Sequence, residues 1–256
     1  MRRTGYVILI TTLTLGIILS SCSKYKVKKG ATLEERMNVA MKMFNNGDYY
    51  DAKSHFRIIT LSHSGSRFAD QAQFYLAECH YNVKEYILAA SEYERLLKVY
   101  PTSEFVDDAK FKLGMSYFQL SPHYGLDQKY TRLAIQHFQE FLEDYYASDL
   151  VEKVERNLIK ARTKLAHKVF ESGDIYRKMG HYRSAKIYYN KVMEEYYDTK
   201  YAPMALYWIG QCNLKLDKPK LALEVYKEFA RKYSNHEWMD RVKDGAQEAQ
   251  EKIRQM

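Results

Sequence analysis

The sequence of 256 residues lacks the short motifs that mark most nucleotide-binding and metal-dependent enzymes. None of its 11 glycines stands in a GxGxxG or GxxxxGK pattern, so the common phosphate-binding loops are excluded. It has no HExxH or CxxC motif, and no two of its 8 histidines are three or four residues apart. Cys79 and His80 are neighbours, but adjacent residues on a helix point in different directions. We therefore predict no catalytic residues, no metal site and no cofactor, in a protein that is not an enzyme.

Proline is also scarce, with 4 residues, and the alternation of apolar and polar residues that marks β-strands is absent. Apolar residues recur at helical spacing along almost the whole chain. The sequence therefore predicts an all-α fold.

The apolar run of residues 6–19 follows Arg2 and Arg3 and leads into the small residues of LSSC, which ends at Cys22. This order of basic, apolar and small residues predicts a signal peptide over residues 1–21. The run is short for a spanning helix, which needs about 20 residues. LSSC resembles the lipobox of bacterial lipoproteins, which implies that Cys22 carries lipid chains such as palmitate. An uncleaved signal anchor with an incidental cysteine is the alternative.

Residues 22–32 form a predicted lipidated basic tether with four lysines: Lys24, Lys26, Lys28 and Lys29. Near an anionic bilayer surface, each lysine adds about 1 kcal/mol of attraction. A solvated, flexible tether is the plainer interpretation, and the two are compatible. Ser23, which follows the cysteine, resembles an outer-membrane address in lipoprotein sorting.

The net charge of +8 is moderate, and basic and acidic residues alternate along the same segments. Removal of Arg2 and Arg3 with the signal peptide leaves 38 basic and 32 acidic residues, a charge of +6. Interleaved charge is typical of a solvated surface rather than of a nucleic-acid site. We therefore expect no nucleic-acid partner.

Five segments share one pattern built around an alanine. The alanines are Ala52, Ala89, Ala134, Ala185 and Ala222. Four residues later each segment has an aromatic residue: Phe56, Tyr93, Phe138, Tyr189 and Tyr226. Twelve residues before the alanine, four segments have a small residue: Ala40, Ala77, Gly173 and Gly210. In the third segment Gly114 takes this role if its loop is eight residues longer.

A small residue opposite an alanine lets two antiparallel helices approach closely, and the aromatic residue fills the space beside them. This pattern is similar to the tetratricopeptide repeat (TPR). The predicted fold is an all-α, TPR-type α-solenoid of about five helix pairs plus a C-terminal capping helix that follows Trp238. Cys79 and Cys212 stand at equivalent places in different repeats, so we expect two buried, free thiols rather than a disulfide.

Repeats three and four depart from regular spacing, because successive repeat alanines are 37, 45, 51 and 37 residues apart. The third repeat contains the long loop SPHYGLDQ. The first helix of the fourth repeat is expected to run from about Val151 to Lys178. Turn signals at Gly47, Gly180 and Pro219 separate the helices within pairs.

Three longer stretches are similar to one family of lipoproteins. They are YPTSEFVDDAKFKLGMSYF (100–118), SPHYGLDQKYTRLAIQHFQEF (121–141) and AHKVFESGDIYRKMGHYRSA (166–185). With the lipobox and the five repeats, they resemble the BamD (YfiO) family of outer-membrane β-barrel assembly lipoproteins over essentially the whole mature chain. Members of that family carry an arginine directly before the GxY turn, where this chain has Met179 after Arg177 and Lys178.

The resemblance implies a membrane-anchored TPR scaffold of the outer-membrane protein assembly (BAM) complex. Repeats 1–3, residues 33–150, would receive unfolded outer-membrane proteins. Repeats 4–5 and the capping helix, residues 151–256, would bind the POTRA domains of a BamA-like β-barrel partner. The implied place is the outer membrane, lipid-anchored and facing the periplasm, with other BAM lipoproteins as further partners. The alternative is a different TPR envelope lipoprotein, such as a coordinator of cell-wall synthesis.

In the TPR register, first-helix positions beside the small residue line the concave face, which is the predicted substrate groove. These positions are Met37, Met41, Phe44, Phe74, Glu78, Tyr81, Phe111, Met115 and Phe118. Methionine adapts to varied shapes, so this lining suits an extended apolar client. Ordinary packing between repeats is the alternative for any single one of them.

The predicted partner-binding surface comes from the fourth and fifth repeats. Its residues are Arg177, Lys178, Met179, Tyr182, Tyr207 and Trp208. Because Met179 replaces the family's arginine, either the basic contact has moved to Arg177 and Lys178 or the interface is built differently. A place in the core is the alternative for Trp208.

Overall fold

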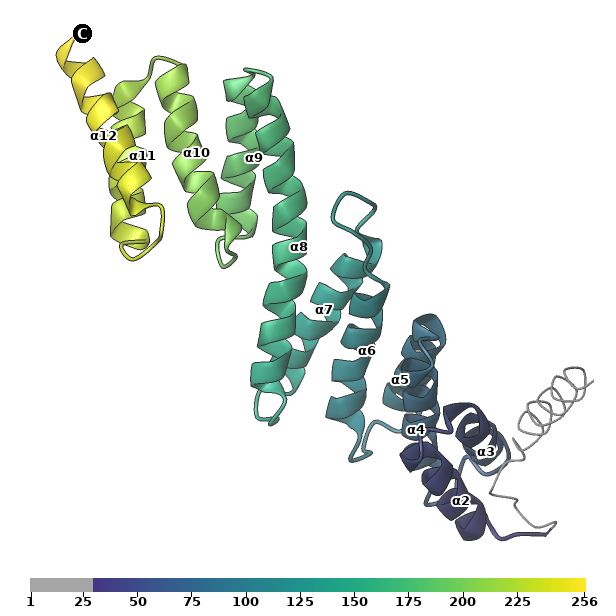
Figure 1. Ribbon diagram of the computed structural model, residues 1–256. Helices are drawn as coiled ribbons and strands as arrows, with labels where there is room; N and C mark the ends of the chain where they lie inside the picture. The colour runs from purple at the N-terminus through teal and green to yellow at the C-terminus, as the bar shows by residue number, and fades with distance from the viewer. Residues whose placement is uncertain (1–29) are drawn as a thin grey trace, which may run out of the picture. The chain divides into compact units, whose positions relative to one another are not determined.

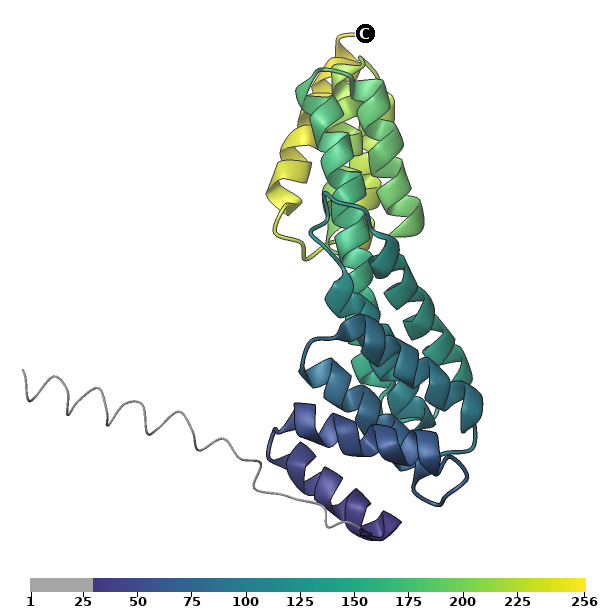
Figure 2. The same ribbon diagram turned by 90° about the vertical axis from the view of Figure 1, so that its right-hand side faces the viewer.

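The computed structural model describes residues 30–256. Within this range the chain forms α-helices and no β-strand, and the helices follow one another as antiparallel hairpins (Figure 1, Figure 2). The predicted signal peptide, Cys22 and most of the predicted tether lie outside the described residues. The all-α expectation is confirmed for the described part of the chain.

Five helix pairs precede one single helix. The pairs are α2 (Leu33–Asn45) with α3 (Tyr49–Ser62), α4 (Ala69–Asn82) with α5 (Tyr86–Val99), α6 (Val106–Leu120) with α7 (Lys129–Asp144), α8 (Val151–Lys178) with α9 (Tyr182–Glu195), and α10 (Tyr201–Lys215) with α11 (Pro219–Lys232); the single helix is α12 (Met239–Arg254). The pairs are the five predicted repeats, so the TPR-type fold with a terminal helix is confirmed.

The described residues form two compact units, which meet in the sequence between Phe105 and Val106. The described part of the first unit holds α2 to α5, and the second holds α6 to α12. This border falls between the second and third repeats, whereas the resemblance places a functional division after the third repeat, at 150/151. Structurally, the third repeat belongs with the fourth and fifth. The functional division stays a prediction.

The repeat pattern places an aromatic ring against each small residue. All five repeat alanines and the aromatic residues that follow them are buried. A Cβ atom on Gly114 would lie 2.7 Å from the ring of Phe138, and one on Gly173 would lie 2.8 Å from the ring of Tyr189. The ring therefore occupies the space that a larger first-helix residue would need. Gly114 is confirmed as the small residue of the third repeat.

The turns inside four of the five pairs share one backbone feature. Gly47, Lys84, Gly180 and Asp217 occupy the same place in their repeats and all have positive φ, at 84°, 64°, 78° and 54°. Glycine adopts this left-handed conformation without strain, whereas lysine and aspartate do so at a cost. The common turn makes each helix pair an equivalent building block.

The helix α8 serves two repeats, because its 28 residues make it far longer than its neighbours. Val154 in its first half lies in one cluster with Phe111 and Phe138 of the third repeat. Phe170 in its second half packs with Tyr189 of the fourth repeat. Figure 1 shows the first half beside α7 and the second half beside α9. The predicted extension from Val151 to Lys178 is confirmed.

The helix α12 covers the apolar side of the fifth repeat. Val242 and Ala249 are buried in one cluster with Tyr226. Its other side is exposed and carries polar residues such as Lys243 and Gln247. An apolar inner face and a polar outer face are what a solenoid needs at its end.

Candidate functional site

Three of the predicted partner-binding residues, Arg177, Tyr182 and Trp208, meet where the end of α8 lies beside α10. We call Asp174, Arg177, Tyr182, Trp208 and Gln211 the Arg177 face. The guanidinium carbon of Arg177 lies 3.8 Å from the centre of a Trp208 ring. Such a cation–π contact contributes about 0.5–1 kcal/mol at exposed sites and more when it is shielded from water. The stacking holds the cation at a defined position on the surface.

Asp174 is the anion that organises this face. Its Oδ1 accepts hydrogen bonds from Arg177 Nε at 3.1 Å and from the Tyr189 hydroxyl at 2.8 Å. Lys178 Nζ lies 3.3 Å from Oδ2. Burial by itself would raise the pKa of Asp174, but the hydrogen bonds from Arg177 and Tyr189 lower that pKa below its usual range. Asp174 is therefore ionised at neutral pH and fixes the orientation of both cations.

A hollow of about 100 Å³ opens beside the guanidinium. Its lining residues are Arg177, Tyr182, Trp208, Gln211, Cys212 and Lys215. Burial raises the pKa of the Cys212 thiol to about 11, so this group is neutral and unreactive. A planar guanidinium held on an indole ring next to polar side chains suits the docking of a carboxylate or carbonyl group from a protein partner.

The structure brings Arg177, Tyr182 and Trp208 together, but other predicted residues lie outside the hollow that these three line. Met179 is 62% exposed at the end of α8. Tyr207 lies edge-on to Trp208, with ring centroids 5.1 Å apart, and its ring also lies 5.3 Å from that of Trp238. It packs with residues of α11 and α12 as well. Tyr207 therefore supports Trp208 from the side of the packing among α10, α11 and α12, and it does not line the hollow beside Arg177.

Sequence reasoning missed three members of this region: Asp174, Gln211 and Lys215. Asp174 stands three and four residues before Arg177 and Lys178, the spacing at which opposite charges pair on a helix. That signal was available in the sequence. The sequence signal for Gln211 was weaker: it lies one helical turn after Trp208 and therefore on the same side of the helix.

The predicted substrate groove of the first unit is only partly accessible. Met37, Phe74 and Glu78 are buried. Phe74 stacks on Phe105 with ring centroids 4.9 Å apart, and the Glu78 carboxylate accepts a hydrogen bond from the Tyr93 hydroxyl. These three residues therefore belong to the packing of the helices and do not offer a binding surface.

Three predicted groove residues of the same unit remain partly open. They are Met41, Phe44 and Tyr81, all half-buried. Phe44 lies edge-on to Tyr75, and Tyr81 lies edge-on to Tyr86, with ring centroids 4.9 and 5.3 Å apart. An apolar client would meet the outer parts of these aromatic pairs.

In the second unit, the predicted groove residues lie beside lysines of α8. Phe111 is buried, with Lys153 Nζ 4.8 Å from its ring centre. Met115 and Phe118 are half-buried, and Lys164 Nζ lies 5.6 Å from the ring centre of Phe118. The accessible part of this region is therefore both apolar and cationic.

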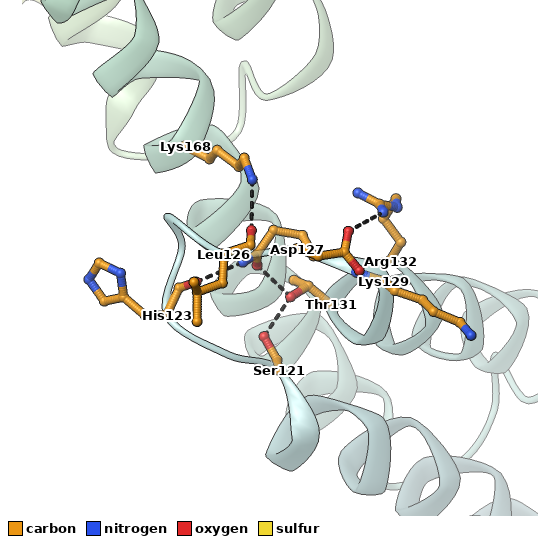
Figure 3. A network of polar contacts seen from close by, with 9 residues as sticks. Ser121, His123, Leu126, Asp127, Lys129, Thr131, Arg132 and Lys168 are labelled. Carbon is orange, nitrogen blue, oxygen red and sulfur yellow. Dashed lines mark hydrogen bonds and ion pairs between the residues drawn. The ribbon is translucent and has the colours of Figure 1, made fainter.

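The long loop of the third repeat, residues 121–128, is attached to α8. Lys164 Nζ donates to the carbonyl oxygen of Ser121 at 3.0 Å. Lys168 Nζ donates to the carbonyl oxygen of Leu126 at 2.7 Å, as Figure 3 shows. Two lysines one turn apart thus satisfy backbone oxygens at both ends of the loop.

Internal hydrogen bonds hold the same loop in shape (Figure 3). The Thr131 hydroxyl lies 2.5 Å from the Ser121 hydroxyl and donates to Gln128 Oε1 at 2.7 Å. Asp127 Oδ2 accepts from the Lys129 backbone N–H at 3.3 Å, at the start of α7. The loop therefore presents a defined surface beside Phe118.

The thiols of the described residues are those of Cys79 and Cys212. Cys79 and Cys212 are buried and free, as predicted. Within residues 30–256, no three histidine, cysteine, aspartate or glutamate side chains are placed to hold a metal ion. No helix in this range combines the length and apolar character needed to cross a membrane.

Solved structures resemble this chain at low sequence identity. The TPR domain of P58(IPK) is 18% identical and covers 87% of this chain and 66% of its own, with a TM-score of 0.42. A tetratricopeptide repeat protein from Parabacteroides merdae is 17% identical and covers 85% of this chain and 84% of its own, with a TM-score of 0.37. The chain spans just under two thirds of the first of these proteins.

Sequence comparisons extend over most of the chain. The outer membrane protein assembly factor BamD of Neisseria meningitidis serogroup B is 24% identical in a match 234 residues long that covers 85% of this chain and 88% of that protein. A family model described as "YfiO: Outer membrane lipoprotein" matches residues 32–242. The match runs from the residue before α2 into α12 and includes the whole Arg177 face. The chain belongs to the YfiO family of outer membrane lipoproteins.

Proposed function

We propose that this protein is a lipid-anchored TPR scaffold of the outer-membrane protein assembly complex, where it binds unfolded β-barrel clients and a BamA-like partner with POTRA domains. Membership of the YfiO family over residues 32–242 is the observation that carries the proposal. The curated relative, named as an outer membrane protein assembly factor, matches along 88% of its length. Such a scaffold acts by binding, so it needs no catalytic group.

The Arg177 face is the proposed site for the POTRA-bearing partner. It offers a cation fixed by Trp208 and Asp174 and a hollow of about 100 Å³, and Lys178 and the exposed Met179 follow Arg177 at the end of α8. Preorganised cations lose little freedom on binding, which favours a defined interface. In this arrangement, Arg177 and Lys178 take the place of an arginine at position 179.

The half-buried aromatic and methionine side chains are the proposed contacts for unfolded clients. Each unit has its own set: Met41, Phe44 and Tyr81 in the first, and Met115 and Phe118 in the second. Client proteins vary in sequence, so a surface of adaptable and aromatic side chains fits them better than a closed pocket.

The proposed location is the periplasmic side of the outer membrane, with Cys22 as the lipid attachment point. This part rests on the family's description as outer membrane lipoproteins and on the LSSC sequence. Stable anchoring needs more than one acyl chain or a chain together with a basic segment, and the four tether lysines supply such a segment.

A pull-down from detergent-solubilised envelopes tests the proposal. The full chain carries a tag, and mass spectrometry identifies what it retains. We expect a barrel protein with POTRA domains as the main partner. A double variant, Lys178→Glu with Met179→Glu, should reduce its recovery about tenfold, which corresponds to about 1.4 kcal/mol.

The matched control is Lys98→Glu with Val99→Glu, which makes the same change of charge at an exposed lysine and an exposed apolar residue at the end of α5, in the other unit. It should leave recovery unchanged. Recovery of cell-wall enzymes in place of a POTRA protein contradicts the assembly function. Equal loss of the POTRA protein in both variants contradicts only the assignment of this partner to the Arg177 face and leaves the assembly function standing.

A further inference from the structure

The helix α3 has a second apolar face besides the one that it buries. Its buried face contributes Ala52, Phe56 and Ile59 to the core of the first repeat. The opposite side exposes Tyr50, Ile58 and Leu61, at 68%, 40% and 64%. A contiguous exposed apolar surface is typical of a site that contacts a protein or a membrane.

The outer residues of α3 form one continuous surface. A shallow hollow of about 400 Å³ lies along it, lined by Tyr50, Lys53, Ser54, Arg57, Ile58, Leu61 and Ser62. On a helix, positions 50, 54, 58 and 61 fall on one stripe. Lys53 and Arg57 border this stripe on one side. Apolar residues with a tyrosine on one face and cations at its edge are typical of a helix that lies in a membrane interface.

The comparable outer surface of α5 is apolar at its start and carries charged residues further along the helix. Ile87 and Leu88 are exposed there to a similar extent, 48% and 49%. Charged residues follow them on the same outer side: Glu94, Arg95 and Lys98. With the offset of 37 residues between the two repeats, Arg95 and Lys98 of α5 stand where α3 has Ile58 and Leu61, so the apolar surface of α5 does not continue along the helix.

The predicted tether brings the lipid close to α3. Cys22 is eleven residues before Leu33, the first residue of α2, so these two positions are at most about 40 Å apart along an extended chain. The two helices are antiparallel, and Arg36 NH1 in the first turn of α2 lies 3.3 Å from His55 Nδ1 in α3. The described chain therefore enters the helix pair, at residues 30–32, at the end of the pair that carries Leu61.

We infer that the outer face of α3, formed by Tyr50, Ile58 and Leu61, lies on the surface of the bilayer to which the lipid anchors the chain. The inference rests on the lipid attachment at Cys22 in the proposed function. Leu61 and Ile58 enter the boundary between head groups and acyl chains, and the Tyr50 hydroxyl stays at the head groups. Arg57 faces the anionic head groups. The anchor thereby gives the first repeat a fixed orientation on the membrane.

Fluorescence on the lipidated full chain tests this contact. The chain is purified from envelopes and reconstituted into vesicles of phosphatidylethanolamine and phosphatidylglycerol. Cysteines at Ile58→Cys or Leu61→Cys carry an environment-sensitive fluorophore, and Ile87→Cys or Leu88→Cys on α5 provide matched control positions. Burial raises the pKa of Cys79 to about 12 and that of Cys212 to about 11, so the native thiols resist labelling.

The expected result is a blue-shifted emission at positions 58 and 61, with severalfold stronger quenching by spin-labelled acyl chains than at positions 87 and 88. Equal, water-like emission at all four positions overturns the inference while the protein still floats with the vesicles. Protection of position 58 that appears only after other envelope proteins are added also overturns it, because the occupant is then a protein. Failure to float overturns the lipid anchor itself, which is a failure of the proposed function.

Discussion

Gly210 has no room for a side chain. A Cβ atom at this position would lie 2.5 Å from Cε1 and 2.7 Å from Cζ of the buried Tyr226 ring. The ring also approaches Gly245 of α12, where an added Cβ would lie 2.7 Å from Cζ. Glycines on both sides confine Tyr226, so it cannot turn aside to admit a methyl group.

We therefore predict that Gly210→Ala destabilises the protein. Overpacking of this kind lowers the free energy of unfolding by about 1–3 kcal/mol. Urea unfolding followed by circular dichroism measures the change. Gly65→Ala is the control, because a Cβ there meets nothing within 4 Å. A loss of stability for Gly65→Ala as large as that for Gly210→Ala would contradict the packing explanation.

The thiols of Cys79 and Cys212 should be inert in the folded protein. Both are buried, and burial raises their pKa to about 12 and about 11, so the reactive thiolate is scarce at neutral pH. A thiol reagent should therefore react with them only as fast as the protein opens, and quickly in urea. Ser64→Cys, at an exposed loop residue, is the positive control and should react at once. Rapid native labelling of Cys79 would show that its burial is wrong.

At the scale of one element, the hairpin turn gives a test of backbone strain that is free of packing effects. Gly180 has a φ of 78°, and a Cβ added to it meets nothing within 4 Å. Lys84 adopts a similar φ of 64° at the same place in its repeat. A non-glycine residue in this conformation costs about 1–2 kcal/mol.

We predict opposite changes for two substitutions in these turns. Gly180→Ala should lower the free energy of unfolding by about 1 kcal/mol, because the alanine must adopt the left-handed conformation. Lys84→Gly should raise it, by less than about 1 kcal/mol, because part of the gain is offset by the greater freedom of glycine in the unfolded chain. Thermal or urea unfolding measures both. A change of the same sign in both variants would show that the turn residue acts through contacts instead.

Features that repeat locally could be predicted from the sequence. Alanine and its aromatic partner recur at fixed spacing because every helix pair solves the same packing problem. The start and end of α8 follow from the distance between Ala134 and Ala185 and from the turn at Gly180. The buried, free thiols follow from the equivalent positions of Cys79 and Cys212.

Features that depend on how many helices surround a residue could not be predicted from the sequence. The register marks Met37, Phe74, Glu78 and Phe111 as concave-face positions, but it does not say how much of a first helix is covered by the helices on either side. All four are buried in the structure. Tyr207 shows the same limit, since the pattern places it next to Trp208 without saying which helix each ring meets.

At the scale of the whole molecule, the buried His80 and the half-buried His167 make stability depend on pH. His80 is buried, with Nδ1 2.6 Å from a Glu85 oxygen and Nε2 3.3 Å from Arg57 NH2. Burial lowers the pKa of His80, and the hydrogen bond to Glu85 offsets only part of this. Burial likewise lowers the pKa of His167, whose ring packs on that of Tyr124 with centroids 3.6 Å apart.

Carboxylates add a second group of lowered pKa values. Burial by itself would raise the pKa of Glu140, but hydrogen bonds from Lys110 and Gln136 outweigh it and lower that pKa to about 2. The pKa of Asp174 is also below its usual range. These groups remain ionised in the folded protein at pH values where the unfolded chain takes up protons.

We predict that acid destabilises the protein in two stages. A group with a lowered pKa in the folded state binds its proton more readily in the unfolded chain, so acid shifts the equilibrium toward unfolding. The histidine contribution is fully present above the ordinary value of 6.5 and falls as the pH drops toward the folded pKa values of His80 and His167. The carboxylate contribution falls only below about pH 4.5, the ordinary pKa of glutamate.

Urea midpoints measured from neutral to acidic pH should show both declines. The double variant His80→Gln with His167→Gln should reduce the first decline to the part that His55 contributes, because burial also lowers the pKa of His55, and it should keep the second decline. His63→Gln, at an exposed position, should keep both. A first decline of undiminished size in the double variant would mean that other groups cause it.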